Sequence, residues 1–178
     1  MIDSKRRKEA QANFVRYLQE GLLKKERNDL AKNKYFENAD LSLKTAVELM
    51  ESSFTPYLWV IVISYYAMFY IANAVLLEQG YKTQEKIAHK VTSDALIVLV
   101  LDRLKKELLE NYESVQQDAL EIANTKAESI VESYSLELDK RSTFQYNMLE
   151  QTKESKAQTS LKRATEFVFE LKKLLKKQ

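Results

Sequence analysis

The sequence has no cysteine, one histidine, one proline and two glycines among its 178 residues. The lack of cysteine excludes disulfides, thiol catalysis and thiolate metal sites. So few glycines and prolines leave little turn chemistry for a sheet protein. Only Gly21 and Gly80 exist, so no glycine-rich phosphate loop can form, and His89 alone cannot provide a cluster of histidines. An all-carboxylate metal site stays open, but nothing in the sequence indicates a metal or a cofactor.

The composition is typical of a folded globular protein, with 30% charged and 45% hydrophobic residues. The first ten residues, MIDSKRRKEA, contain no apolar stretch like that of a secretory signal. Because the chain also lacks disulfides, we expect a cytoplasmic protein. The formal net charge of +2 says little about partners, although local basic clusters could bind nucleic acid.

The longest apolar stretch, FTPYLWVIVISYYAMFYIANAVLLEQG, covers residues 54–80 and predicts one long helix. Thr55 can cap its first turn, and Pro56 suits the first helical position. Gly80 follows the last apolar residues and can adopt the left-handed conformation that ends a helix. About 24 residues at about 1.5 Å each would give a rod of roughly 36 Å.

This helix carries no formal charge between Tyr57 and Leu77, so every side of it must be covered by other helices or by lipid. Its length would suit a membrane span. Hydroxyl and amide side chains in its middle are costly in hydrocarbon, and the remaining segments are amphipathic. We therefore expect a central helix buried within a protein, with a membrane span as the alternative.

The rest of the chain also has helical periodicity. The expected helices cover residues 4–27, residues 28–53, residues 94–110, residues 114–139 and a last segment after 147 that includes the apolar seam of residues 157–175. The pattern predicts a single all-α domain over residues 1–178, an antiparallel up-and-down bundle of five or six helices. Residues 1–28 would be a helical extension of a bundle formed by residues 29–178.

A basic cluster, Lys5 to Lys8, lies in the first turns of the expected N-terminal helix. Cations at this end of a helix oppose its dipole. The cluster could be a solvated, fraying helix end, or it could hold an acidic partner or nucleic acid.

Four segments, in this order, resemble the HEPN domain family. SYYAMFYIANAVLLEQGY at residues 64–81 is similar to the second core helix of small prokaryotic HEPN proteins, and His89 lies where these often carry a histidine. Arg141-Ser-Thr-Phe-Gln-Tyr146 resembles their Arg-x-x-Ala-Asp-Tyr segment. AQTSLKRATEF at residues 157–167 is similar to their last helix. The resemblance covers roughly residues 30–176.

The resemblance implies a helical bundle that usually forms a homodimer. Many members are metal-independent ribonucleases, often toxins partnered with a small nucleotidyltransferase. Their motif is an arginine followed four to six residues later by a histidine. In this chain Arg141 is followed in that window by Tyr146 and no histidine, and Phe144 and Gln145 replace the alanine and aspartate.

The residues that match the motifs are the candidate ligand-binding site: Arg141, Tyr146, Tyr65, Tyr66 and His89. Arginine can hold a phosphate in its planar fork, and histidine can move protons near neutral pH. Arg141, Tyr146 and His89 are the catalytic candidates.

Each candidate also has a structural alternative. Arg141 could cap the preceding helix or pair with a nearby carboxylate, and His89 could be a hydrogen-bonded structural residue. Tyr65 and Tyr66 could both be core aromatics, which is the default for such residues. They point about 100° apart on the helix, so one can be buried while the other reaches a groove.

The leading functional hypothesis is a HEPN-type module that binds RNA or a nucleotide. It would form a homodimer, with a nucleotidyltransferase as a candidate partner and without a membrane. The alternatives are a structural protein-interaction bundle that binds no nucleotide, and a metal-independent ribonuclease that uses Arg141.

Overall fold

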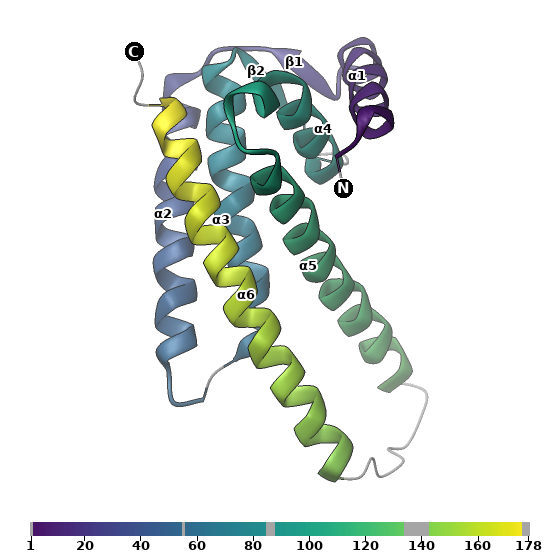
Figure 1. Ribbon diagram of the computed structural model, residues 1–178, viewed down its shortest axis with the longest axis vertical. Coiled ribbons are helices and arrows are strands. Elements are labelled where there is room, and N and C mark those ends of the chain that lie inside the picture. Colours follow the sequence, from purple (N-terminus) through teal and green to yellow (C-terminus); the bar gives the residue numbers. More distant parts are fainter. Residues whose placement is uncertain (1, 55, 85–87, 134–142, 176–178) are drawn as a thin grey trace.

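The computed structural model describes residues 2–54, 56–84, 88–133 and 143–175, and the side chains of these residues apart from those between 123 and 152. The elements, labelled in Figure 1, are α1 (Ser4–Gln19), β1 (Leu23–Lys25), α2 (Asp29–Glu51), α3 (Tyr57–Glu78), β2 (Tyr81–Thr83), α4 (Ala88–Val100), the 3-10 turn η1 (Leu101–Arg103), α5 (Lys106–Ser133) and α6 (Thr143–Leu175). The expected all-α bundle is confirmed.

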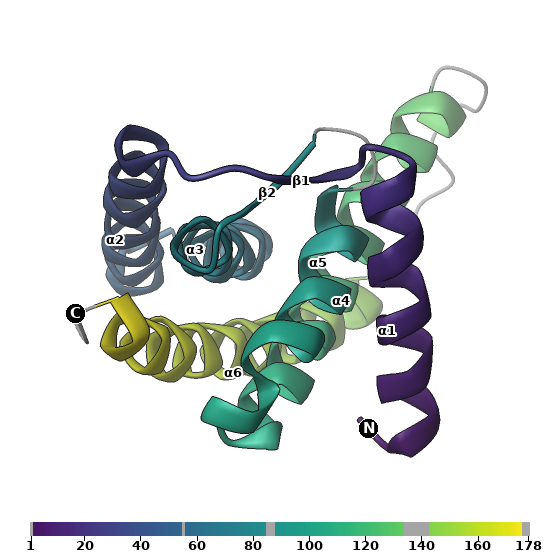
Figure 2. The ribbon, with the colours of Figure 1, turned by 90° about the horizontal axis from the view of Figure 1, so that it is seen from above.

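Helix α3 is the centre of the bundle. Seen from above, α2, α6 and α5 lie on three of its sides, and the two short strands cross its end on the fourth (Figure 2). By length and composition α3 could cross a membrane, but 72% of its most apolar 18-residue stretch is buried inside this chain. Because the chain's own helices cover most of it, the hydrophobic effect that drives folding is concentrated on this helix.

The ends of α3 follow the expected chemistry in part. Gly80 has a φ of 84°, so it provides the left-handed residue that ends the helix, as predicted. Pro56 directly precedes the first helical residue instead of occupying the first position inside the helix. The predicted cap, Thr55, lies outside the described residues.

The expected N-terminal helix over residues 4–27 is too long. Helix α1 ends at Gln19, and Gly21 then turns the chain with a φ of 70°. A helix cannot continue through a left-handed residue, so Gly21 ends α1. The side chain of Asp3 caps the other end, accepting from the backbone N–H of Arg6 at 2.7 Å.

After this turn the chain forms a strand that the sequence did not predict. Strands β1 and β2 pair antiparallel, with Leu23 opposite Thr83, Lys24 opposite Lys82 and Lys25 opposite Tyr81. This two-stranded ribbon links the N-terminal extension to the connection between α3 and α4. It is stabilised from below by Phe14, whose ring meets that of Tyr81 edge-on at 5.3 Å.

The expected helix over residues 94–110 is in fact parts of two helices. Helix α4 begins earlier, and the chain leaves helical geometry at Leu104, which has an extended conformation with φ −128° and ψ 156°. Helix α5 starts at Lys106, eight residues before the start expected for the helix over residues 114–139. Helix α6 begins at Thr143, before the end of the interruption expected over residues 140–147.

The N-terminal extension is joined to the bundle by a buried ionic network. The guanidinium of Arg6 lies 2.6 Å from Asp94 Oδ1 and 2.7 Å from Glu113 Oε1. Tyr17 and Asn13 each donate a hydrogen bond of 2.9 Å to the other Asp94 oxygen. Burial, helped by Asp94, raises the pKa of Tyr17 to about 12. A fraying, fully solvated basic end is therefore the wrong interpretation for Arg6, although its neighbours in the cluster are exposed.

Candidate functional site

Tyr65 and His89 meet at the junction of α3 and α4. The Tyr65 hydroxyl lies 2.5 Å from His89 Nδ1, and their rings are 5.4 Å apart between centroids. Tyr65 is only 2% exposed, whereas His89, the second residue of α4, is half-buried. The contact fixes the imidazole ring against the central helix.

Tyr66 is the exposed member of this group. It is 38% exposed and its ring lies 5.7 Å from Tyr65 and 6.3 Å from His89. The default interpretation, in which both tyrosines are core aromatics, therefore holds for Tyr65 but not for Tyr66. Tyr65 and Tyr66 therefore place a buried hydroxyl beside an accessible aromatic ring.

Other aromatic rings, which the sequence did not single out, complete the cluster. Phe69, one turn after Tyr65 on α3, lies 4.7 Å from His89 between ring centroids. Tyr112 from α5 lies 6.0 Å from Tyr65 and stacks at 5.2 Å on Phe167 from α6. The spacing of Tyr65 and Phe69 on one helix could have indicated their proximity, but the contributions of α5 and α6 depend on tertiary packing.

The surroundings keep this cluster uncharged. Burial raises the pKa of Tyr65 above its usual range, so its hydroxyl stays protonated at neutral pH. Burial also lowers the pKa of His89 below 6.5, which favours the neutral imidazole. An uncharged imidazole beside exposed Tyr66 can donate or accept one hydrogen bond and can pack against a flat ring.

The two candidate residues near the expected motif cannot be joined to this cluster. Arg141 lies outside the described residues. Tyr146 belongs to α6, but its side chain is outside the described part of the molecule. Of the five predicted site residues, the structure brings together Tyr65, Tyr66 and His89.

A buried amide on α3 has a structural role in the same region. Asn73 donates to the Phe69 carbonyl at 2.9 Å and to Thr92 at 3.4 Å, and it accepts from Thr83 at 2.6 Å. These bonds tie α3 to β2 and α4. They hold the chain on both sides of the segment that leads to His89.

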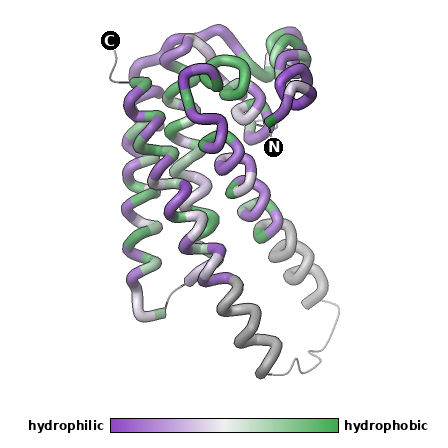
Figure 3. The backbone as a smooth tube through the Cα atoms, in the orientation of Figure 1, coloured by the Kyte–Doolittle hydropathy of each residue, from purple (hydrophilic) through white to green (hydrophobic). Residues whose placement is uncertain are grey.

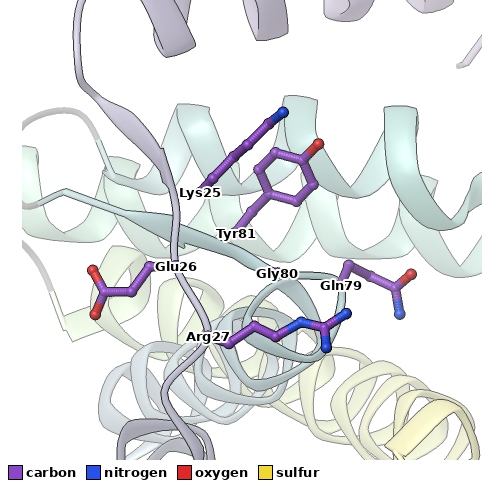
Figure 4. Close-up of a pocket in the computed structure, with 6 residues that line it drawn as sticks. All are labelled: Lys25, Glu26, Arg27, Gln79, Gly80 and Tyr81. Atoms are coloured by element: carbon purple, nitrogen blue, oxygen red, sulfur yellow. The ribbon is translucent and has the colours of Figure 1, made fainter.

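A shallow pocket of about 380 Å³ lies at the ribbon end of the bundle (Figure 4). It is lined by Lys25, Glu26, Arg27, Gln79, Gly80 and Tyr81. Neither its lysine nor its arginine was a predicted site residue. In the described part of the chain, no group of three or more His, Asp or Glu side chains is placed to hold a metal ion.

Comparison with known proteins assigns the chain to a family. A family model described as HEPN domain matches residues 33–174, which include all of α3, α4 and α5. No curated protein and no solved structure matches the sequence. The matched region contains the Tyr65–His89 contact and excludes α1 and β1. The extent of this match shows that the chain belongs to the HEPN domain family.

Proposed function

We propose that this protein is an RNA- or nucleotide-binding HEPN module that acts by binding, not by cleavage. The observation that carries the proposal is the Tyr65–His89 contact beside the exposed ring of Tyr66. A base can stack on an exposed aromatic ring, and such stacking is worth about 1–3 kcal/mol per base. Family membership supports the choice of ligand class.

The role of His89 follows from its hydrogen bond. The Tyr65 hydroxyl keeps its proton because its pKa is raised, and the tautomer of His89 decides whether this hydroxyl donates to Nδ1 or accepts from it. In the tautomer that accepts from Tyr65 at Nδ1, the hydrogen of the neutral imidazole is on Nε2, so His89 offers a donor to a ligand. A general base needs an unprotonated nitrogen facing the substrate, so this tautomer favours binding over proton abstraction.

Removing the exposed ring tests the proposal. Tyr66→Ala should weaken binding of a single-stranded RNA oligonucleotide about 5- to 150-fold, which is the range expected for one lost stacking contact. Phe169→Ala is the matched control, because Phe169 is 61% exposed on α6 and should leave the affinity unchanged. Fluorescence anisotropy at low salt measures both.

If the wild-type protein shows no binding to RNA or nucleotides at low salt, the binding proposal is wrong. The chain would then be an interaction bundle. Equal loss of affinity in Tyr66→Ala and Phe169→Ala would remove Tyr66 from the site while leaving RNA binding intact.

We further propose that the protein works in the cytoplasm as a homodimer and that a small nucleotidyltransferase is its protein partner. The family resemblance supports the partner and the dimer. Co-purification of the two proteins from cells that express both would test the partnership, and their separation on a sizing column would contradict it.

A further inference from the structure

The N-terminal extension carries the positive charge of this protein. Residues 1–28 include eight Lys or Arg residues and four Asp or Glu residues, a formal charge of +4, whereas the whole chain has +2. The remaining residues therefore carry −2, and they include the whole segment matched by the HEPN model. The cationic character comes from a part of the chain that the family match does not cover.

This extension is fixed on the molecule. The ion pair between Arg6 and Asp94 holds α1 beside α4, and β1 is hydrogen-bonded to β2. Figure 3 shows a largely hydrophilic chain where β1 leads over the top of the bundle into α2. Its charges therefore have defined positions, unlike those of a flexible tail.

Positive charges accumulate on the ribbon. Lys24 lies directly opposite Lys82, and like charges at opposed positions of an antiparallel pair destabilise it. Glu26 accepts a hydrogen bond from Lys82 at 2.8 Å and so neutralises one of the two. Within the described residues, no carboxylate lies within ion-pair distance of Lys24, Lys25 or Arg27.

Two of these cations border the shallow pocket. In Figure 4, Lys25 extends alongside the ring of Tyr81, and Arg27 extends in the same direction as Gln79. Glu26 points away from these side chains. The Cα atoms of Lys25 and Arg27 are two residues apart on extended chain and so lie about 7 Å from one another. Both side chains line the same pocket, so two neighbouring cations lie on one side of the ribbon.

We propose that the cationic face of the ribbon, defined as Lys25 and Arg27, is a second contact surface that binds the phosphate backbone of single-stranded RNA. Lys24 and Lys82 point to the opposite face of the ribbon, because side chains alternate along a strand and Lys82 pairs there with Glu26. This inference rests on the proposed RNA binding and adds to it a surface from outside the segment matched by the family model. The ribbon binds phosphates without reading sequence, because lysine and arginine contacts to phosphate carry no base information. Tyr66 and His89 supply the contact with a base.

Salt dependence separates the two surfaces. Each phosphate contact to a single strand contributes about 0.7 to the slope of log affinity against log salt concentration. The variant Lys25→Gln/Arg27→Gln should therefore lower the slope for a fluorescent oligouridine by about 1.4. Tyr66→Ala should weaken binding with the slope unchanged, because a stacking contact releases no counterions.

The control variant is Lys34→Gln/Lys44→Gln, which removes the same charge from exposed positions on α2. Its slope should match that of the wild type. Circular dichroism melting of each variant checks that the fold is retained.

The outcomes distinguish the two ideas. A wild-type slope in the ribbon variant, together with weaker binding in Tyr66→Ala, would overturn the ribbon as an RNA surface and leave the proposed function in place. An equal fall in slope in the ribbon and control variants would also overturn it, because the effect would then be one of net charge. Absence of RNA binding by the wild type would overturn both.

Discussion

The His89 imidazole is held between a buried hydroxyl and a phenyl ring, and this environment has a consequence for stability. Burial lowers its pKa, so the folded protein keeps the ring neutral below the ordinary value of 6.5. The unfolded chain binds a proton as the pH falls through about 6.5, while the folded chain does so only at lower pH. More protons bound by the unfolded state mean that stability falls as the pH falls through this window.

Urea denaturation at pH 7.5 and pH 5.5 checks this consequence. The free energy of unfolding of the wild type should decrease more between these pH values than that of His89→Gln. Glutamine has no titratable group, but it can still form a hydrogen bond with Tyr65. Parallel decreases in the two proteins would show that His89 titrates as it does in water.

The roles of some single residues could be predicted from the sequence, and the roles of others could not. Gly80 was predictable because only a glycine tolerates the left-handed conformation after a long helix. The 100° step between helical neighbours allowed one of Tyr65 and Tyr66 to be exposed, but it could not show which of the two would be. The network around Asp94 was missed, although a carboxylate at the start of the apolar run ALIVLVL could have indicated a buried ion pair.

At the scale of elements, periodicity identified α2, α3 and the second half of α6. It could not show the break at Leu104, because the residues before and after it both have helical patterns. The ribbon was also missed, since strands of three residues have no measurable alternation, and Lys24 and Lys25 are poor indicators of a strand. The aromatic residues that α5 and α6 contribute to the candidate site were missed for a different reason. Packing between distant segments brings them to the site, and local periodicity carries no information about such packing.

The docking of α1 on the bundle can be tested through Arg6. Arg6→Ala leaves Asp94, which is 0% exposed, as a buried charge without its partner. Breaking a buried pair in this way typically costs about 3–5 kcal/mol. We expect a loss of free energy of unfolding of this size in urea, with faster hydrogen exchange in α1.

Arg7→Ala is the control for that experiment. Arg7 is 51% exposed and lies 3.6 Å from an exposed Asp102, so its removal should change stability by about 0.5 kcal/mol or less. Similar losses for both variants would mean that the Asp94 pair does not hold α1.

At the scale of the whole molecule, two large aromatic side chains are exposed near the connection between α2 and α3. Phe54 is 72% exposed and Trp59 is 54% exposed. Exposed aromatic groups of this size are typical of interaction sites. We propose that a second copy of the chain covers them, so that the two Tyr66 sites, two helical turns further along α3, come close to the dimer interface.

Analytical ultracentrifugation checks this arrangement. Trp59→Glu should shift the protein from dimer to monomer, because a charge is placed in an apolar contact. Leu30→Glu is the control, because Leu30 is 84% exposed in the first turn of α2, at the opposite end of that helix, and should leave the mass unchanged. A wild-type protein that sediments as a monomer at micromolar concentration would contradict the proposed dimer.

The bond between Arg6 and Asp94 also constrains how this sequence can diverge. Loss of either residue strands the other charge in the interior, so neither position can drift alone. Simultaneous replacement by apolar residues of similar volume is open, since such exchanges of a buried ion pair are often neutral or favourable. Descendants of this chain should therefore either keep both residues or have lost both, and α1, α4 and α5, which meet at this joint, should be inherited as one unit.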